Sequence, residues 1–448
     1  MNNKTMVKDL TQGNVAKLLI AFTLPLFLSN SLQAAYNIVD MVIVGQFIGG
    51  PGISAVSIGG DILHLITFIA IGFASAGQVI IARKVGEGKI DELSHIIGTM
   101  FSFLLLCALG LSIICFICRN AILTALNTPD ESYEYAMDYM VTCIFGLVFI
   151  YGYNIVSAIL RGMGDGKRPF VFVAIAAILN TVLDYVFVVI CKIGVFGAAL
   201  ATVIGQGVSF IVSIIYLYVK RESFGFDFKL KSFLIRKEVL KPLVSLGIPM
   251  SIQSAAISFS RIILTAWINI EGVMYSALGG IYNKMGAILG VAGASFIASG
   301  STMVGQNLGA KKYDRVPQIM GVIIAMGAII STIFSIAVYF FPQKLFSLFT
   351  NDQQVLSLAS LLSIPSVLFF AGSALRNGFF CLINGSGNTK MNFAIALLDA
   401  MIARIGIAYF MCFKLGMGSL GCWYGDALAG FVPVAIGIGF YASMKWKK

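Results

Sequence analysis

The chain has 448 residues, of which 58% are hydrophobic and 11% are charged, and its mean hydropathy is +0.91. A soluble domain carries about 25% charged residues, so this composition excludes a soluble protein and indicates one embedded in a membrane. The net charge of +11 does not by itself indicate nucleic-acid binding, because the positions of the basic residues decide what they do.

Long apolar runs, separated by short polar segments, fill most of the chain. A helix needs about 20 apolar residues to cross a hydrocarbon core about 30 Å thick, whereas a β-barrel would show short alternating segments. The runs therefore predict an all-α protein with twelve transmembrane helices. The first six cover residues 18–47, 54–82, 95–118, 133–160, 169–190 and 196–219. The second six cover residues 242–270, 275–305, 316–341, 353–383, 391–413 and 419–443.

Lysine and arginine are distributed unevenly between the two sides of these helices. With the N-terminus placed inside, most of the basic residues outside the helices fall in the inner segments. The outer segments hold only Arg119, Lys192, Lys344 and Lys414. This bias follows the positive-inside rule, so we expect both termini in the cytoplasm and no binding to nucleic acid.

The first half carries two acids deep in predicted helices, Asp40 and Asp184. A carboxylate at mid-membrane costs about 2.5–3.5 kcal/mol, so each needs a partner or a function. Polar residues recur at helical spacing on the first, fifth and sixth predicted helices: Gln33, Tyr36 and Asn37 near Asp40, Asn180 near Asp184, and Thr202 with Gln206 on 196–219. With no basic residue predicted in these helix cores, two carboxylates and neutral oxygen donors suit a small cation or a shared proton. The alternative is that both acids only hold helices together by hydrogen bonds.

A glycine-rich turn after the fourth helix resembles a phosphate-binding loop. In Gly162–Lys167, however, the first glycine of that motif would fall on Arg161, and Arg168 takes the place of the required Ser or Thr. The eight cysteines show no paired metal spacing. We therefore expect no nucleotide hydrolysis, no enzyme activity and no cofactor apart from a coupling ion.

The longest polar stretch lies between the two halves. It predicts an N-terminal six-helix lobe at 1–220, a cytoplasmic linker at 221–241 and a C-terminal six-helix lobe at 242–448. Apolar and basic residues alternate in Phe233–Lys241, which favours an interfacial helix on the inner leaflet, with a solvated linker as the alternative.

The second half places four bases and only two acids within its predicted helices. The bases are Arg261, Lys284, Arg376 and Arg404, and the acids are Asp399 and Asp426. Two positive charges therefore stay uncompensated if all six groups are ionised. These bases could form structural ion pairs, for which we expect Lys284 and Arg376 to be the partners of the acids, or they could receive an anionic group of a substrate.

The two halves repeat one another at an offset of 223 residues. Ile80–Lys89 lies over Met303–Lys312, and Leu160–Lys167 lies over Ile383–Lys390. One residue further on, Pro25 aligns with Pro249, and Gly194–Gly197 with Gly418–Gly421. Two apolar halves built on one plan are typical of secondary transporters.

These motifs resemble those of the multidrug and toxic compound extrusion (MATE) family. The resemblance rests on the paired Leu-x-x-Pro and Leu-Gly-Ile-Pro segments, on Gly305–Ala310 and on the turns at Arg161 and Asn384. It implies two six-helix lobes in a V around a central cavity, and drug efflux driven by sodium or proton entry. The family's first-lobe cation site, a possible Na⁺ site, matches Asp40, Asn180, Asp184 and Thr202. The absence of an acid in 247–270 makes the chain more similar to the DNA-damage-inducible branch.

We therefore expect an ion-coupled antiporter that exports amphipathic organic compounds across the plasma membrane by alternating access. We expect it to act as a monomer in the lipid bilayer. A lipid-linked precursor flippase is an alternative, but such flippases usually carry fourteen helices. A membrane-embedded enzyme would need a nucleophile or a metal constellation, and a passive channel would not need a carboxylate pair.

Overall fold

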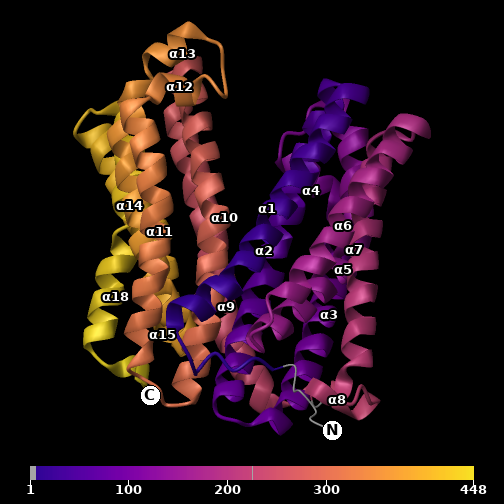
Figure 1. Ribbon diagram of the computed structural model, residues 1–448. Helices are drawn as coiled ribbons and strands as arrows, with labels where there is room; N and C mark the ends of the chain where they lie inside the picture. Colours follow the sequence, from indigo (N-terminus) through magenta and orange to yellow (C-terminus); the bar gives the residue numbers. More distant parts are fainter. Residues whose placement is uncertain (1–6, 225, 448) are drawn as a thin grey trace. The chain divides into compact units, whose positions relative to one another are not determined.

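The computed structural model describes residues 7–224 and 226–447 (Figure 1). The regular elements in this part of the chain are all helical, and twelve of them are long and apolar enough to cross a membrane. The predicted fold class is therefore confirmed.

The first half contains six long helical spans. Its helices are α1 (Val15–Phe47), α2 (Gly50–Gly86), α3 (Leu93–Ile117), the short α4 (Arg119–Ala125), α5 (Asp130–Gly162), α6 (Lys167–Asp184), α7 (Gly194–Val219) and the single turn α8 (Arg221–Phe224). A 3₁₀ turn, η1 (Ile90–Glu92), precedes α3, and a π-helical segment, η2 (Tyr185–Ile190), extends α6.

The second half repeats this series with more interruptions. Its helices are α9 (Lys237–Asn269), α10 (Val273–Gly309), α11 (Arg315–Phe340), α12 (Pro342–Phe346), α13 (Gln353–Ser357), α14 (Ser363–Ser386), α15 (Thr389–Leu397), α16 (Arg404–Tyr409), α17 (Gly418–Ala429) and α18 (Val432–Ala442). The 3₁₀ turns are η3 (Leu230–Phe233), η4 (Ala359–Leu362) and η7 (Lys445–Lys447), and the π-helical segments are η5 (Leu398–Ala403) and η6 (Phe410–Lys414).

Most helix ends lie within a few residues of the predicted ones, and the tenth span shows the largest difference at its start. We expected it to begin at residue 353, but the span begins at Ala359. The preceding residues form α13 instead, whose first turn is capped by Asp352, with the Gln354 N–H donating to its carboxylate over 2.8 Å. This N-cap starts the short α13, and the spanning helix begins only after it, at Ala359.

Helix packing follows the sequence repeat. In the first half α2 packs along α5, and α5 packs along α7. In the second half the corresponding spans do the same, α10 along α14 and α14 along α17. The repeated sequence therefore builds two bundles with the same neighbours.

The chain divides into two compact units, and each contains a segment from the other half. The first unit contains Leu24–Gly247, and the second contains Leu10–Thr23 together with the described residues from Ile248 onward. The chain passes from one unit to the other close to Pro25 in α1 and close to Pro249 in α9. The units therefore differ from the lobes that we predicted, because 10–23 packs with the second unit and 242–247 with the first.

The repeat motif at the end of the eighth span, with the residues just after it, holds the exchanged N-terminal segment. The Leu10 N–H donates to Gln306 Oε1 over 2.9 Å, and Asn307 Nδ2 donates to the Leu10 carbonyl over 3.3 Å. Lys312 Nζ and Arg315 Nη1 donate to the Thr11 and Gly13 carbonyls, both over 2.9 Å. This motif is thus a structural clamp within the second unit.

The inter-lobe linker does not form a separate interfacial helix at Phe233–Lys241, which was one of the two alternatives for this segment. Instead η3 ends at Phe233, and Lys237 begins the long α9. Ser102 Oγ of α3 donates to the Phe233 carbonyl over 2.5 Å, and the Arg236 N–H donates to Thr99 Oγ1 over 3.2 Å. Docking onto α3 satisfies the backbone of this segment and so replaces a separate helix.

A hydrogen-bonded turn precedes this docked segment. The Ser232 hydroxyl and the Lys229 N–H donate to Asp227 Oδ1 over 2.5 and 3.2 Å. These bonds hold the pKa of the exposed Asp227 below its ordinary value. The turn therefore keeps a carboxylate charge at the start of the linker.

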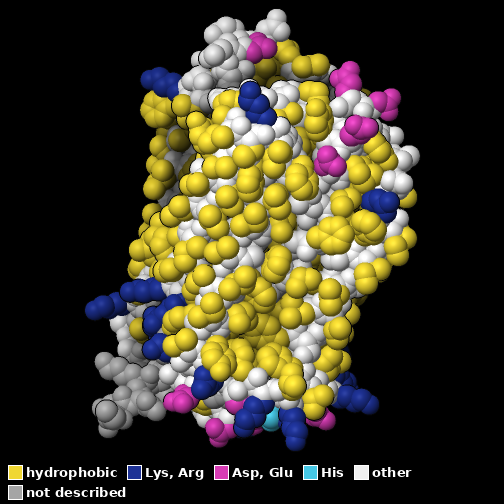
Figure 2. Space-filling model, turned by 90° about the vertical axis from the view of Figure 1, so that its right-hand side faces the viewer, with side chains coloured by type: hydrophobic (Ala, Val, Ile, Leu, Met, Phe, Trp, Pro, Cys, Tyr) yellow, Lys and Arg dark blue, Asp and Glu magenta, His cyan; other side chains and the backbone are white. Residues whose placement is uncertain are grey.

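The surface agrees with insertion into a membrane. Figure 2 shows a face on which hydrophobic side chains cover the middle, while charged side chains gather mainly toward its two ends. Large apolar residues such as Ile113, Ile117 and Ile178 are more than half exposed on the spanning helices. Such a surface is stable against lipid rather than water.

Candidate ion and substrate sites

The first unit brings together two acids that are far apart in the sequence. Asp40 lies on α1 and Asp184 on the last turn of α6, and their side chains lie within electrostatic range of each other. Asp40 is 6% exposed and Asp184 is 0% exposed. No ion pair to either carboxylate occurs among the residues that the structure describes.

Asn180 and Thr202 lie beside this acid pair, on the adjacent helices α6 and α7. The Asn180 amide and the Thr202 hydroxyl are 3.3 Å apart. In the amide orientation that satisfies both of its ends, Asn180 donates to Asp184 Oδ2 over 3.3 Å and accepts from the Thr202 N–H and hydroxyl. Three of the four predicted cation-site residues are therefore joined by direct contacts.

One carboxylate oxygen of each acid has no donor. Asp40 Oδ1 and Asp184 Oδ1 are both buried without a hydrogen-bond partner in the described part of the chain. Leaving a buried charged acceptor unsatisfied costs about 1–3 kcal/mol or more. Each acid therefore keeps one buried acceptor atom that no donor of the described residues satisfies.

Next to the acids, a tyrosine on α1 organises the neighbouring polar side chains. Tyr36 is buried, and its hydroxyl accepts from Gln206 Nε2 over 3.2 Å and from Gln33 Nε2 over 3.5 Å. Asn37, which we expected on the same polar face, is exposed. Asn37 therefore does not belong to the buried polar side chains around Tyr36, although its spacing along α1 predicted that it would.

Sequence reasoning missed two further neighbours of Asp40. Tyr139 and Cys143 of α5 are buried within electrostatic range of its carboxylate. They lie one turn apart in a part of α5 where polar and apolar residues alternate without a clear period, so a tyrosine and a cysteine there look like packing residues. Only the packing of α5 against the other helices shows where they lie.

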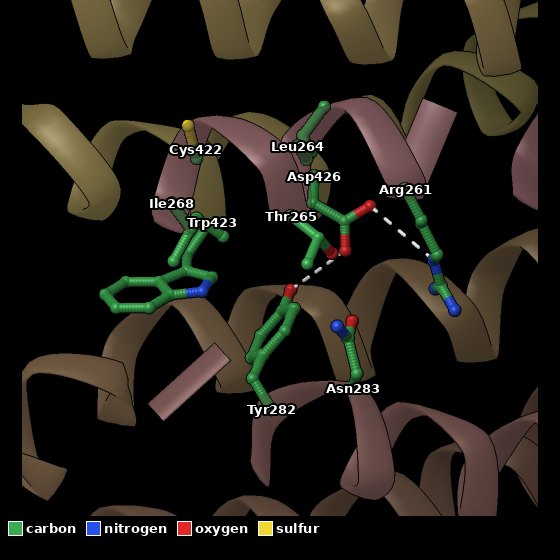
Figure 3. A pocket seen from close by; sticks show the side chains of 9 residues that line it. All are labelled: Arg261, Leu264, Thr265, Ile268, Tyr282, Asn283, Cys422, Trp423 and Asp426. Carbon is green, nitrogen blue, oxygen red and sulfur yellow. Dashed lines mark hydrogen bonds and ion pairs between the residues drawn. The ribbon is translucent and has the colours of Figure 1, made fainter. Parts of the chain in front are cut away.

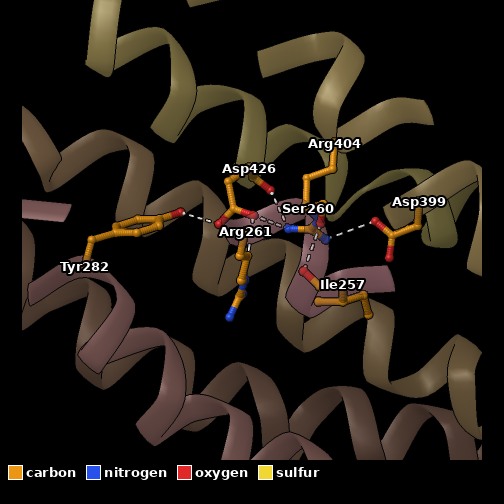
Figure 4. A network of polar contacts seen from close by, with 7 residues as sticks. All are labelled: Ile257, Ser260, Arg261, Tyr282, Asp399, Arg404 and Asp426. Atoms are coloured by element: carbon orange, nitrogen blue, oxygen red, sulfur yellow. Dashed lines mark hydrogen bonds and ion pairs between the residues drawn. The ribbon is translucent and has the colours of Figure 1, made fainter. Parts of the chain in front are cut away.

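The two acids buried in the spanning helices of the second unit, Asp399 and Asp426, are paired, in contrast to Asp40 and Asp184. Arg404 is 0% exposed and donates to Asp399 Oδ1 over 3.0 Å and to Asp426 Oδ1 (Figure 4). Tyr282 Oη donates to the other oxygen of Asp426 over 3.1 Å. Arg261 Nε lies 4.0 Å from Asp426 Oδ1, at the limit of an ion pair. One guanidinium thus neutralises much of the charge of two carboxylates.

Local helix geometry explains the pair between Asp399 and Arg404. Asp399 lies in η5, and Arg404 begins α16 directly after it. A π-helical turn brings residues five apart in sequence to the same face, whereas an α-helix aligns residues three or four apart. The bulge therefore places these two side chains on one face, where Asp399 can bind Arg404.

Lys284 and Arg376 do not have the role that we expected, because they pair with neither acid. Lys284 is exposed, and Arg376 lies over the Phe380 ring at 5.7 Å with no ion pair among the described residues. Arg404 and Arg261 hold the acids instead. The physical reason is that Arg404 lies one π-helical turn from Asp399 and reaches Asp426 with its other nitrogen.

A pocket borders this charged network in the second unit. Arg261 and Thr265 of α9, Tyr282 and Asn283 of α10, and Asp426 of α17 line a small cavity of about 10 Å³, enough for about one water molecule (Figure 3). Arg261, Thr265 and Asn283 also line a wider pocket of about 500 Å³. Sequence reasoning missed Tyr282 and Asn283, because single polar residues in an apolar run carry no pattern.

The oxygen donors of the first unit fit a monovalent cation better than a transition metal. No group of three or more His, Cys, Asp or Glu side chains suited to a metal occurs in the described ranges. Asp40, Asp184, Asn180 and Thr202 offer carboxylate, amide and hydroxyl oxygens, which are hard ligands. Sodium and a proton are both compatible with this donor set.

Comparisons with known proteins agree with the repeat and with the fold. The MatE family profile matches residues 25–186 and again residues 249–410. The chain is 27% identical over 435 residues to the probable multidrug resistance protein YoeA of Bacillus subtilis, covering 95% of this chain and 93% of that protein. It is 25% identical over 478 residues to the probable multidrug resistance protein NorM of Thermotoga maritima, covering 97% and 94%. Its fold is similar, with a TM-score of 0.91 at 21% identity and complete coverage of both chains, to a MOP superfamily transporter from Pyrococcus furiosus.

Proposed function

The chain belongs to the MatE family of multi-pass membrane transporters, and we propose that it is an antiporter exchanging sodium ions or protons for amphipathic organic compounds. It is a transporter and not an enzyme. Export takes place across the plasma membrane by alternating access, with both termini in the cytoplasm. The uneven distribution of Lys and Arg supports this orientation.

The observation that carries the coupling proposal is the acid pair of the first unit. Asp40 and Asp184 are buried near each other, and each has one oxygen without a donor. Two such carboxylates repel one another, so binding a positive charge between them is favourable. Because a bound cation changes the charge of this site, ion binding and release can drive a change in helix packing.

The same residues hold either coupling ion. Sodium would be held by Asp40 and Asp184 together with the Asn180 amide oxygen and the Thr202 hydroxyl. A proton would be shared by the two carboxylates alone, with Asn180 donating to Asp184. Binding of a sodium ion would add a positive charge without any proton transfer. The surrounding side chains would position the ion and neutralise its charge.

Two features support the finer assignment to drug export and to the DNA-damage-inducible branch. Several relatives of similar length carry names that describe them as probable multidrug resistance proteins. The part of α9 that belongs to the second unit, Ile248–Asn269, contains no Asp or Glu. The coupling acids of this chain then belong to the first unit only.

Everted membrane vesicles test the coupling directly. We would load rhodamine 123 or fluorescein and impose a sodium gradient and a proton gradient in separate experiments. Transport should follow one of the gradients in the wild-type chain and disappear in Asp40→Asn. Transport that needs neither gradient would contradict the proposal, and the exposed variant Lys344→Gln serves as a control that should transport normally.

A further inference from the structure

The wider pocket of the second unit contains a positive charge that the protein only partly neutralises. Arg261 Nε lies 4.0 Å from Asp426, and this nitrogen is buried without a hydrogen bond in the described part of the chain. Both oxygens of Asp426 already accept from Arg404 and Tyr282. Asp426 therefore has little remaining capacity to neutralise Arg261.

The Arg261 side chain is held in place without being covered. Its guanidinium carbon lies 5.4 Å from the centre of the Phe369 ring, which in turn packs against Tyr282. The side chain is 30% exposed, and Figure 4 shows its end pointing away from Asp426. A guanidinium fixed on an aromatic face keeps its outer N–H groups free, and these groups match the geometry of a carboxylate or phosphate.

The surrounding charges increase the positive potential at Arg261. Three guanidinium groups, on Arg261, Arg376 and Arg404, lie within electrostatic range of only two carboxylates, on Asp399 and Asp426. Arg376 makes no ion pair in the ranges that the structure describes, so the cluster has an excess positive charge. A bound anion would remove this excess.

The rest of the pocket lining suits an amphipathic anion. Ser258, Arg261, Thr265 and Asn269 recur at spacings of three and four residues, so they follow one face of α9. Asn283 of α10 adds an amide on the opposite wall, and the exposed Ile262 adds apolar surface. The pocket thus offers one cation, several neutral donors and an apolar side in about 500 Å³.

We propose that this pocket binds the carboxylate, sulfonate or phosphate group of anionic or zwitterionic amphiphiles, with Arg261 as the residue that recognises the charge. The inference deepens the proposed export function and rests on it, since it names the substrate class of the second unit. The neutral donors Thr265, Asn269 and Asn283 complete the hydrogen bonds of the anion. The apolar part of the substrate contacts the Ile262 side of α9.

Binding of two matched dyes to the purified full chain in detergent tests the site. Fluorescein and rhodamine 123 share a xanthene skeleton but carry opposite charge at neutral pH, and fluorescence anisotropy measures the affinity of each. Arg261→Gln should weaken fluorescein binding about tenfold or more, because it removes hydrogen bonds to a charged group. Arg261→Lys should retain part of the affinity, and rhodamine 123 binding should not weaken in either variant.

A second variant and a control keep the result interpretable. Asn283→Leu changes an exposed side chain of the same pocket and should weaken fluorescein binding severalfold even where Arg261→Gln does not fold. Lys344→Gln removes an exposed charge outside the pocket and should change neither dye. Equal loss of both dyes, unchanged fluorescein binding in both pocket variants, or no fluorescein binding by the wild-type chain would each overturn the proposal.

Transport in proteoliposomes separates this inference from the proposed function. Selective loss of fluorescein transport in Arg261→Gln, with rhodamine 123 transport retained, supports the anion pocket. Fluorescein binding that depends on Arg261, together with no ion-driven transport of either dye, leaves the pocket supported and contradicts the antiporter. Ion-driven transport of rhodamine 123 without any fluorescein binding supports the antiporter and contradicts the pocket.

Discussion

The four acids buried in the spanning helices differ in what surrounds them. Asp399 and Asp426 share the guanidinium of Arg404, whereas Asp40 and Asp184 each retain an oxygen without a donor. A paired acid stabilises one arrangement of helices, while an unpaired acid can exchange its charge with the solution. The acids of the second unit therefore belong to a structural network, and those of the first unit form a candidate coupling site.

Asp40→Asn is expected to abolish ion-coupled efflux while the protein still inserts and folds. The amide keeps the shape of the side chain but can neither exchange a proton nor balance a cation. Asp184→Asn should behave similarly, and the double variant should be no worse than the worse single variant, because two members of one site are not additive. Vesicle efflux measures this, and losses that multiply in the double variant would indicate two independent sites.

Arg404→Leu is expected to destabilise the protein by about 3–5 kcal/mol, because it leaves two buried carboxylates without their cation. Lys284→Met is the matched control, since Lys284 is exposed and pairs with neither acid. Thermal unfolding in detergent measures both. A melting temperature that falls for Lys284→Met but not for Arg404→Leu would contradict the pairing seen in the structure.

At the scale of the elements, irregular segments place the polar groups. The η5 segment aligns Asp399 with Arg404, and the linker replaces a helix with a backbone docked on α3. Docking at α3 depends on a glycine, because a Cβ at Gly98 would overlap the Ser232 carbonyl. Small residues thus allow close approach where a regular helix packs against an irregular chain.

Gly98→Ala is expected to destabilise the first unit by about 1–3 kcal/mol through overpacking against the backbone of the linker. Gly110→Ala on the same helix is the matched control, because no heavy atom lies within 4 Å of the added Cβ. Alanine is the better helix former, so Gly110→Ala should not lower the melting temperature. Equal melting temperatures for the two variants would show that the linker moves away without cost.

For the whole molecule, the exchange of segments ties each half of the sequence to both units. Residues Leu10–Thr23 pack with the second unit, and residues up to Gly247 pack with the first. Each half of the chain therefore supplies part of the unit that the other half mainly builds. Cutting the covalent linker should then leave the two fragments associated.

Co-expressed fragments 1–225 and 226–448 are expected to purify together when only the second carries an affinity tag. The clamp of Gln306, Asn307 and Lys312 on the Leu10–Gly13 backbone contributes hydrogen bonds to this association. Deleting residues 10–23 from the first fragment should reduce its recovery severalfold. Full recovery after that deletion would contradict the importance of the exchanged segment.

Features that depend on composition and repetition could be predicted from the order of the amino acids alone. Long apolar runs predicted twelve spans because lipid requires each segment to satisfy its own backbone, and the offset of 223 residues predicted two similar bundles. Asp40 and Asp184 stood out because acids are rare in such runs, Asn180 and Thr202 recur at helical spacing with other polar residues, and the resemblance to the MATE family implied the set of four. Their role in ion coupling remains a proposal.

The contacts between side chains of different helices followed only from the packing of those helices. Spacing along α1 predicted both Tyr36 and Asn37 on the polar face, and helix packing buries Tyr36 but leaves Asn37 exposed. The number of charges in the second half suggested Lys284 as a partner for the acids. The π-helical turn instead places Asp399 beside Arg404, which donates a hydrogen bond to it. Contacts between helices depend on how each helix is rotated about its axis, on irregular turns, and on small residues that let two backbones come close. None of these leaves a periodic signal in the sequence.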